Sequence, residues 1–477
     1  MRRLRRPLRA LAGPALFSAA LFGAAGCDTL RDNVLGSGPA VGTPGFVAGF
    51  LGGVVADEPR AALIGRDILS AGGNATDAAV AVAVAMAVTL PSRAGLGGGG
   101  VCVVYDPSRN GPNKGVPEVV VFTPPVVKAS GARPAGVPML ARGLFAMHAR
   151  YGKLPFEQVI TRAEQLARFG TPISRAFARD IAVVAAPLAA DPGTRPFFGA
   201  DGQPLAEGAT LQQPDLAVTL ATLRTQGVGD LYQGGLARRI VAASPDLGAG
   251  LTAATLRAGL PRFAPAIDEE IGRDVLAVPP TDAGVATVGA VRVLRENPSA
   301  ADAAQGRAAA LATGVRAGQQ GIALLATPDL APGTLPALPA SAALVTLDAQ
   351  GRSVACALSM GNLFGTGRVV PETGILLGAS PVAVPPALLA PAMVYNTNLH
   401  AFRAAAVGTG QGSAALAAAA AVLGALSDAA TTTVLPTPPP DPGRAAVIAC
   451  ARYLPETEQS CGWATDPRGA GLAVGSN

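Results

Sequence analysis

The sequence predicts an α+β protein in which helices and strands pack in close layers. Charged residues make up only 14% of the 477 positions, against roughly a quarter in typical soluble domains, while apolar residues reach 49% and are mostly Ala and Val. Alternating apolar positions predict two short strands on either side of the polar turn Asp348–Arg352. Residues 60–106 have the pattern of a helix, a turn, a helix, a glycine loop and a strand. A chain of this length can bury a substantial core.

The N-terminal segment has the pattern of an export signal. It begins with several arginines, continues with an apolar run over residues 15–25, and places small residues directly before Cys27. This is similar to a bacterial lipoprotein signal, so we expect residues 1–26 to be removed and Cys27 to carry the lipid anchor. An ordinary secretory peptide cut near the same place is the alternative. The lipoprotein signal predicts a periplasmic protein anchored to the bacterial membrane, with residues 27–53 as a flexible spacer.

The charge distribution argues against a nucleic-acid-binding protein. The formal net charge is +5, but five arginines of the leader account for this excess, which leaves no basic stripe in the rest of the chain. The later apolar runs, residues 78–90 and 414–426, are shorter than the roughly 20 residues that a bilayer span requires. We therefore expect both runs to form buried helices.

Four cysteines follow Cys27, and they do not have the spacing of a metal site. There is no Cys-x-x-Cys pair and only two histidines occur, so we expect no bound metal. Cys450 and Cys461 flank a turn-like segment over residues 455–459 and could face each other across a hairpin. In an oxidising compartment these two would form a disulfide; two unpaired thiols are the alternative.

Four consecutive glycines, residues 97–100, allow two interpretations. A phosphate-binding loop requires a strand, the loop and then a helix, with Gly-Lys-Ser/Thr at its end, whereas here a helix precedes and a strand follows. Close packing of the backbone explains the glycines better.

Several motifs together resemble the gamma-glutamyltransferase family. The motif of its small subunit is matched by Asp348, Gly351, the loop Phe364-Gly365-Thr366-Gly367 and the element Gly374-Ile375-Leu376-Leu377. The opening of its large subunit is similar to residues 72–105, and the family's C-terminal motif is similar to residues 462–468. The resemblance extends over most of the chain after the leader.

This resemblance implies a four-layer αββα sandwich of the N-terminal-nucleophile hydrolase type. Family members are made as one precursor that cuts itself, and the cut would fall here between Ala340 and Ser341. Residues 54–340 and 341–477 would then be the large and small parts of one joint folding unit. Ser341 corresponds to the nucleophile, Ser359 to the second hydroxyl of the site, and Gly412 to the turn that supplies oxyanion-hole amides. The substrate would be a small amide or peptide, such as glutathione, and no cofactor is implied.

The residues that hold glutamate in the family are replaced in this chain. The Thr-Thr-His triplet that opens the family's small subunit is replaced here by Ser341-Ala342-Ala343. The strand segment 120–125 has no arginine to bind the substrate's carboxylate. The acidic pair and the Ser-Ser-Met trio correspond to the largely apolar segments 378–383 and 387–389. A pocket of this composition favours a less polar amide over a zwitterionic glutamyl group.

Two functional hypotheses follow. The first is an exported amide hydrolase or acyl transferase that uses an N-terminal serine and has a degenerate glutamate site. The second is a noncatalytic envelope lipoprotein that keeps the fold as a binding or structural module, in which Ser341 only begins a strand and Ser359 only faces it. Self-cleavage separates the two hypotheses, because the amine base cannot exist without the cut.

Overall fold

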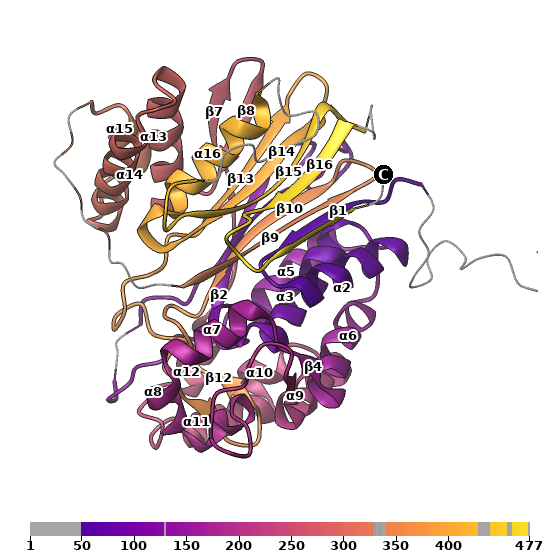
Figure 1. Cartoon of the computed structure of the whole chain (residues 1–477), viewed down its shortest axis with the longest axis vertical. Helices are drawn as coiled ribbons and strands as arrows, with labels where there is room; N and C mark the ends of the chain where they lie inside the picture. Colours follow the sequence, from indigo (N-terminus) through magenta and orange to yellow (C-terminus); the bar gives the residue numbers. More distant parts are fainter. Residues whose placement is uncertain are drawn as a thin grey trace, which may run out of the picture.

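Two antiparallel sheets lie face to face, and helices cover the outer face of each sheet (Figure 1). The structure is a computed structural model that describes residues 49–127, 130–328, 330, 333, 335, 340–427, 439–455 and 460–475. The predicted αββα sandwich is confirmed. No helix in the described residues is both apolar enough and long enough to cross a membrane.

The first sheet carries Ser341 and joins strands from both ends of the sequence. In spatial order its strands are β17 (Leu472–Gly475), β1 (Gly52–Ala56), β9 (Ser341–Asp348), β10 (Ser353–Ser359), β2 (Gly99–Tyr105), β3 (Glu118–Phe122) and β6 (Arg262–Pro265). β1 and β9 lie side by side although they are far apart in the sequence (Figure 1). β1 begins at Gly52, so the last two residues of the predicted spacer, 52 and 53, belong to a strand. The residues before position 49 lie outside the described part of the chain.

The second sheet packs on the inner face of the first. Its strands, in spatial order, are β16 (Cys461–Thr465), β15 (Arg444–Leu454), β14 (Ala401–Thr409), β13 (Ala390–Asn396), β8 (Asp274–Val278) and β7 (Ile267–Ile271). The core between the sheets is built largely from Ala and Val, with Met393, Tyr395 and Phe402 as larger members. Small side chains on both inner faces let the two sheets approach closely.

The outer helices bury the remaining faces of the sheets. The first sheet is covered by α2 (Pro59–Ser70), α3 (Ala75–Thr89) and α5 (Leu140–Tyr151), and α6 (Phe156–Phe169) packs on α3. The second sheet is covered by α13 (Asp282–Glu296) and α16 (Ala414–Leu426), and α14 (Ala301–Arg316) packs on these two helices. α3 begins at a capping box formed by Asn74 and Asp77, and every residue of α3 is buried. The apolar runs 78–90 and 414–426 thus lie in α3 and α16, as predicted.

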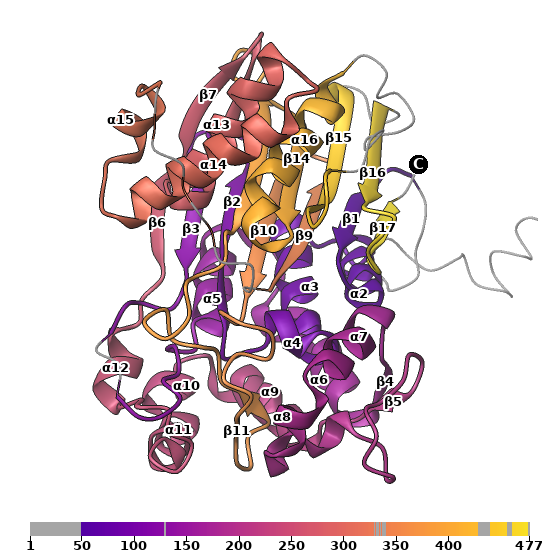
Figure 2. The same ribbon diagram turned by 60° about the vertical axis from the view of Figure 1, so that its left-hand side comes forward.

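Shorter elements gather at the lower end of the molecule and beside the second sheet (Figures 1 and 2). They are α4 (Pro91–Ala94), β4 (Thr171–Pro172), α7 (Arg175–Val183), α8 (Ala185–Ala189), η1 (Pro192–Phe197), β5 (Thr210–Leu211), α9 (Pro214–Gln226), α10 (Asp230–Gln233), α11 (Gly235–Ala243), α12 (Ala253–Ala258), α15 (Gly321–Leu325), β11 (Val369–Val370), β12 (Ile375–Leu376) and η2 (Gln411–Ser413). Among these, η2 contains Gly412.

Candidate active site

Ser341 and Ser359 lie opposite each other at one end of a β-hairpin. Ser341 is the first residue of β9 and pairs in register with Ser359, the last residue of β10. The turn at the other end forms because the Asp348 carboxylate accepts hydrogen bonds from the backbone N–H groups of Gln350 and Arg352, at 3.0 and 3.1 Å. Gly351 has a φ of +80° there, a conformation that glycine adopts without strain.

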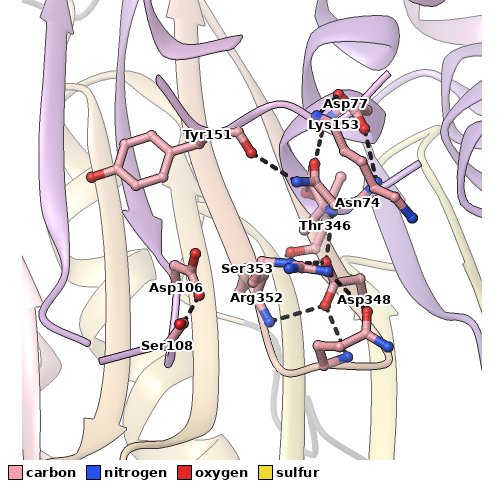
Figure 3. A network of polar contacts seen from close by, with 12 residues as sticks. Asn74, Asp77, Asp106, Ser108, Tyr151, Lys153, Thr346, Asp348, Arg352 and Ser353 are labelled. Atoms are coloured by element: carbon pink, nitrogen blue, oxygen red, sulfur yellow. Dashed lines mark hydrogen bonds and ion pairs between the residues drawn. The ribbon is translucent and has the colours of Figure 1, made fainter. Parts of the chain in front are cut away.

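A buried polar network fixes this hairpin to the helical layer (Figure 3). The second oxygen of Asp348 accepts the N–H of Ala75 at 3.0 Å, at the start of α3, and the Nε of Arg352 at 2.7 Å. The Thr346 hydroxyl donates to the Ala75 carbonyl at 2.7 Å, and the Ser353 hydroxyl donates to the Thr346 carbonyl at 2.8 Å. Asp348, identified from the sequence motif, is thus an anchor between the hairpin and α3.

The start of β9 is held by Asp57, which follows β1. The Ala343 N–H donates to Asp57 Oδ2 at 2.8 Å, and the Asp57 N–H donates to the Ala343 carbonyl at 3.1 Å. Loss of hydration raises the pKa of Asp57, while the Ala343 hydrogen bond and the charge of Arg93 act in the opposite direction. β9 is therefore fixed at both ends, and Ser341 has a defined backbone position.

The hydroxyl of Ser341 is buried and unpaired. Ser341 is 4% exposed, and its Oγ has no hydrogen-bond partner among the residues that the structure describes. Because side chains alternate along a strand, Ser341 shares a face with Ala343 and Val345, which belong to the core between the sheets. A buried hydroxyl without a partner costs about 1–3 kcal/mol, and such a cost is a reason to look for a function.

Ser359 contacts the peptide bond that precedes Ser341. Its hydroxyl donates to the carbonyl oxygen of Ala340 at 2.7 Å and accepts the N–H of Gly361 at 2.9 Å. A donor at this oxygen polarises the carbonyl and stabilises negative charge that develops there during nucleophilic attack. The Ser359 hydroxyl therefore contacts the peptide unit that joins Ala340 to Ser341.

Gly412 is the third site residue named from the sequence. It lies in η2, where its carbonyl accepts a hydrogen bond from Gln305 Nε2 at 3.1 Å. A Cβ built on Gly412 would lie 3.2 Å from Cβ of Leu335, in the segment that leads to Ser341. Gly412 therefore faces Leu335, and it is not among the residues that line the pocket beside Ser359.

A pocket of about 310 Å³ adjoins Ser359 and Gly361. Most of its wall is apolar, and the wall includes positions where the sequence lacks the family's glutamate-binding residues: Thr123, Pro124, Ala379, Pro381, Ala387 and Leu389. Gly99 of the glycine run also lines the pocket. A Cβ on Gly99 would collide with the carbonyl oxygen of Phe122, so this glycine serves close backbone packing.

The pocket also contains an ion pair that the sequence analysis did not identify. Arg316, at the end of α14, places its Nε 2.6 Å from Oδ2 of Asp282, in the first turn of α13. Its Nη2 donates to the Pro386 carbonyl at 2.9 Å. The strand β3 and the following Thr123 and Pro124 carry no guanidinium, as expected, but α14 supplies one to the same pocket.

Four cysteines form two disulfides. Cys450 and Cys461 lie opposite each other in β15 and β16 and are joined, the pairing favoured from the sequence. Cys102 of β2 and Cys356 of β10 form a second disulfide that the sequence did not indicate. In the described residues no group of three or more His, Cys, Asp or Glu could hold a metal ion. Cys27 lies outside the described residues.

Comparisons with known proteins agree with this fold and motif pattern. Residues 61–316 match the gamma-glutamyltranspeptidase family. The chain is 32% identical over 249 residues to glutathione hydrolase 3 of Arabidopsis thaliana, covering 50% of this chain and 39% of that protein. It is 31% identical over 256 residues to the glutathione hydrolase proenzyme of Bacillus subtilis, covering 49% of this chain and 42% of that protein. The matches thus span about two fifths of these curated relatives.

Solved structures extend the likeness of fold to most of the chain. A cephalosporin acylase from Bacillus halodurans superposes with a TM-score of 0.71 at 19% identity, covering 90% of this chain and 96% of that chain. Helicobacter pylori gamma-glutamyltranspeptidase gives a TM-score of 0.51 at 23% identity, covering 61% of this chain and 95% of that chain. The family match covers more than half of the chain, and the chain belongs to the gamma-glutamyltranspeptidase family.

Proposed function

We propose that this protein is a self-processing amide hydrolase or acyl transferase that cuts itself between Ala340 and Ser341. The cut yields a large part that contains residues 54–340 and a small part, residues 341–477, and the two remain one folding unit. A single observation carries the proposal: the unpaired hydroxyl of Ser341 is next to a carbonyl, that of Ala340, which Ser359 already polarises. This is the arrangement that an intramolecular acyl shift requires.

Self-cleavage proceeds in two steps, an acyl shift and a hydrolysis. Oγ of Ser341 attacks the carbonyl carbon of Ala340, the peptide C–N bond breaks, and the proton of the hydroxyl is transferred to the departing amine. The product is an ester between Ala340 and Ser341. Water then hydrolyses the ester, which leaves a carboxylate on Ala340 and restores the hydroxyl of Ser341. The Ser359 hydroxyl stabilises the oxyanion in the first step through its hydrogen bond to the carbonyl oxygen.

The freed amine makes Ser341 a nucleophile toward other amides. The neutral α-amine accepts the hydroxyl proton while Oγ attacks the substrate carbonyl, and an acyl-enzyme forms as the amine product leaves. Water or a second amine then takes the acyl group. An α-amino group has a reference pKa of about 7.7–8.0, so the rate of acyl transfer rises with pH through this range. We assign Gly412 to the oxyanion site of this second reaction, after Leu335 has moved from it.

The pocket favours an acyl group that is mainly apolar. Its charged side chains, Arg316 and Asp282, already neutralise each other, and Arg316 is further held by the Pro386 carbonyl. A zwitterionic glutamyl group loses its hydration on entry, and this pocket offers it little compensation. We therefore propose that the glutamate site is degenerate and that glutathione is a poor substrate.

We further propose export to the periplasm with a lipid anchor on Cys27. The leader, residues 1–26, carries this part of the proposal through its arginine-rich start, apolar run and small residues before the cysteine. Two disulfides among the described cysteines agree with an oxidising compartment. Metabolic labelling with a radioactive fatty acid tests the anchor: label should enter the wild-type protein and be absent from Cys27→Ala.

Intact-mass measurement under reducing conditions tests the central proposal. The wild-type protein should give two chains, with the small chain beginning at Ser341. Ser341→Ala should give one chain, and Ser341→Thr, which keeps the hydroxyl, should cleave again. Ser353→Ala is the matched control, since Ser353 is a buried residue of the same hairpin whose hydroxyl, within the described part of the chain, donates a hydrogen bond only to the Thr346 carbonyl. A wild-type protein that stays in one piece would favour the noncatalytic lipoprotein instead.

A further inference from the structure

The disulfide between Cys102 and Cys356 joins two segments that the proposed self-cleavage would separate. The two cysteines are 254 positions apart in sequence and lie directly opposite each other in the neighbouring strands β2 and β10. Ala340 and Ser341 lie between them in the chain. Cys450 and Cys461, by contrast, both lie in the small part, so their disulfide joins that part only to itself.

We propose that the processed protein is a disulfide-linked heterodimer, with Cys102–Cys356 as its one covalent link between large and small parts within the described residues. The proposal rests on the proposed function in one respect, the cut before Ser341. The disulfide itself does not depend on the cut. Both side chains are fully buried, so the bond sits inside the helical-side core rather than on an accessible surface.

The position of this bond relates it to the candidate site. Cys102 is next to Val101 in β2, and Val101 lines the pocket; Cys356 lies in β10, the strand that ends at Ser359. The pocket is built from both parts, with Val101, Arg316 and Asp282 from the large part and Ser359 and Gly361 from the small part. The disulfide therefore fixes the distance between β2, which contributes Val101 to the pocket, and β10, which ends at Ser359.

The thermodynamic consequence follows from mass action. Without a covalent link, a cut protein unfolds into two chains, so its stability falls as the protein is diluted. With the link, both parts unfold as one molecule, and their effective concentration for refolding stays high. Formation of the bond removes two protons and two electrons from the two thiols. A thiol–disulfide oxidant of the kind present in oxidising compartments accepts them.

Electrophoresis of the full-length protein, with free thiols alkylated before denaturation, tests the proposal. The wild-type protein should migrate as one band without reductant and as two bands with reductant. The double variant Cys102→Ala/Cys356→Ala should give two bands in both conditions. Cys450→Ala/Cys461→Ala is the matched control and should behave as the wild type does. Two bands from the wild type without reductant would overturn the proposal.

A failure of self-cleavage can be told apart from a failure of the link. If the wild type gives one band even with reductant, the cut has not occurred, and the proposed function fails. In that case residues 336–339 are replaced by the recognition site of a sequence-specific protease on the Ser341→Ala background, and the chain is cut with that protease. The link predicts that the cut protein still migrates as one band until reductant is added, and separation without reductant would overturn it.

Two measurements on the wild-type protein test the link if the double cysteine variant does not fold. Peptide mapping of the wild type without reduction should yield one cross-linked species that contains Cys102 and Cys356, and two separate alkylated peptides would contradict the link. Dilution of the cut wild-type protein from denaturant should restore the fold to the same extent over a hundredfold range of protein concentration. After reduction and alkylation in denaturant, recovery should fall with dilution.

Discussion

The hydroxyl of Ser359 lies 2.7 Å from the carbonyl oxygen of Ala340, so the last residue of β10 contacts the peptide bond that precedes Ser341. Two backbone positions hold this relationship in place. Ser359 and Ser341 are paired in register, and the Gly361 N–H donates a hydrogen bond to the Ser359 hydroxyl. The orientation of the Ser359 hydroxyl is therefore set before any reaction begins.

Ser359→Ala should slow self-cleavage without unfolding the protein. Removal of one donor to a developing oxyanion typically costs about 10²–10³ in rate, and we expect a reduction in this range. The half-life of the uncut chain after translation in a cell-free system, followed by reducing electrophoresis, measures the effect. Ser359→Thr keeps the hydroxyl and should cleave at close to the wild-type rate. Equal cleavage rates for Ser359→Ala and wild type would remove Ser359 from the mechanism.

Substitution of the pocket ion pair should change the preference for charged acyl groups. Asp282→Asn removes the carboxylate that neutralises Arg316, so ligands with a terminal carboxylate should bind about tenfold more tightly, a change of about 1.4 kcal/mol. Arg316→Met should weaken binding of the same ligands and leave neutral ligands of equal length almost unaffected. Calorimetric titration with matched pairs of monocarboxylic and dicarboxylic monoamides measures both effects. An unchanged preference in both variants would place the pair outside the acyl site.

Asp348→Ala should destabilise the protein strongly. Asp348 is 2% exposed, and its replacement removes the contacts with the Ala75 N–H, the Arg352 side chain and the turn amides. Breaking a buried charged network of this kind costs about 3–5 kcal/mol, which chemical denaturation would detect. Asp201→Ala is the control, because exposed Asp201 accepts only the Gln203 N–H, and its loss should cost about 0.5 kcal/mol or less. Similar losses for both variants would contradict the anchoring role of Asp348.

The raised pKa of Asp57 predicts a specific pH dependence of stability. The folded protein holds a proton on Asp57 more tightly than the unfolded chain, whose value is close to 3.8. The free energy of unfolding should therefore contain a contribution that is present below pH 3.8 and is lost as the pH rises through the higher folded pKa. Asp57→Asn should remove this contribution, while the exposed control Asp246→Asn should not. Urea unfolding at pH values from 3 to 7 measures the difference between the variants.

The charged groups around Asp57 decide how large this pH effect is. Arg93 lowers the pKa of Asp57, while Asp180 and Asp466 raise it. Arg93 is itself paired with Asp180 through two hydrogen bonds of 2.7 and 2.6 Å, so the charge of Arg93 acts on both Asp180 and Asp57. Arg93→Gln should therefore raise the pKa of Asp57 further. NMR titration of the Asp57 carboxyl carbon measures this pKa. A lower pKa of Asp57 in Arg93→Gln than in the wild type would contradict the effect assigned to Arg93.

Local patterns in the sequence predicted the elements that carry the site. The alternating residues of β9 and β10 and the Asp348–Arg352 turn specify the hairpin, because side-chain period and turn chemistry act over a few residues. Small and apolar residues likewise marked α3 and α16 as buried helices. These features depend on neighbours in sequence, so one sequence suffices to identify them.

Contacts between distant segments could not be predicted in this way. Arg316 reaches the pocket because α14 ends beside α13 and the Pro386 segment, and no spacing in the sequence indicates this arrangement. The pairing of Cys102 with Cys356 depends on the strand order, in which β2 lies next to β10. The contact of Gly412 with Leu335 also joins segments that are far apart in the sequence. Each of these contacts depends on how distant segments are arranged in the fold, and that arrangement was expected only through the family resemblance.

The complete burial of α3 has a consequence for how a nascent chain folds. α3 packs against β9 and β10, which a ribosome makes long after α3 has emerged. Until then the face of α3 that packs against these strands has no partner, so the first half of the polypeptide cannot finish folding before β9 and β10 have been made. Such a delay leaves the newly made chain unfolded for longer, and a secretion channel threads polypeptides in the unfolded form.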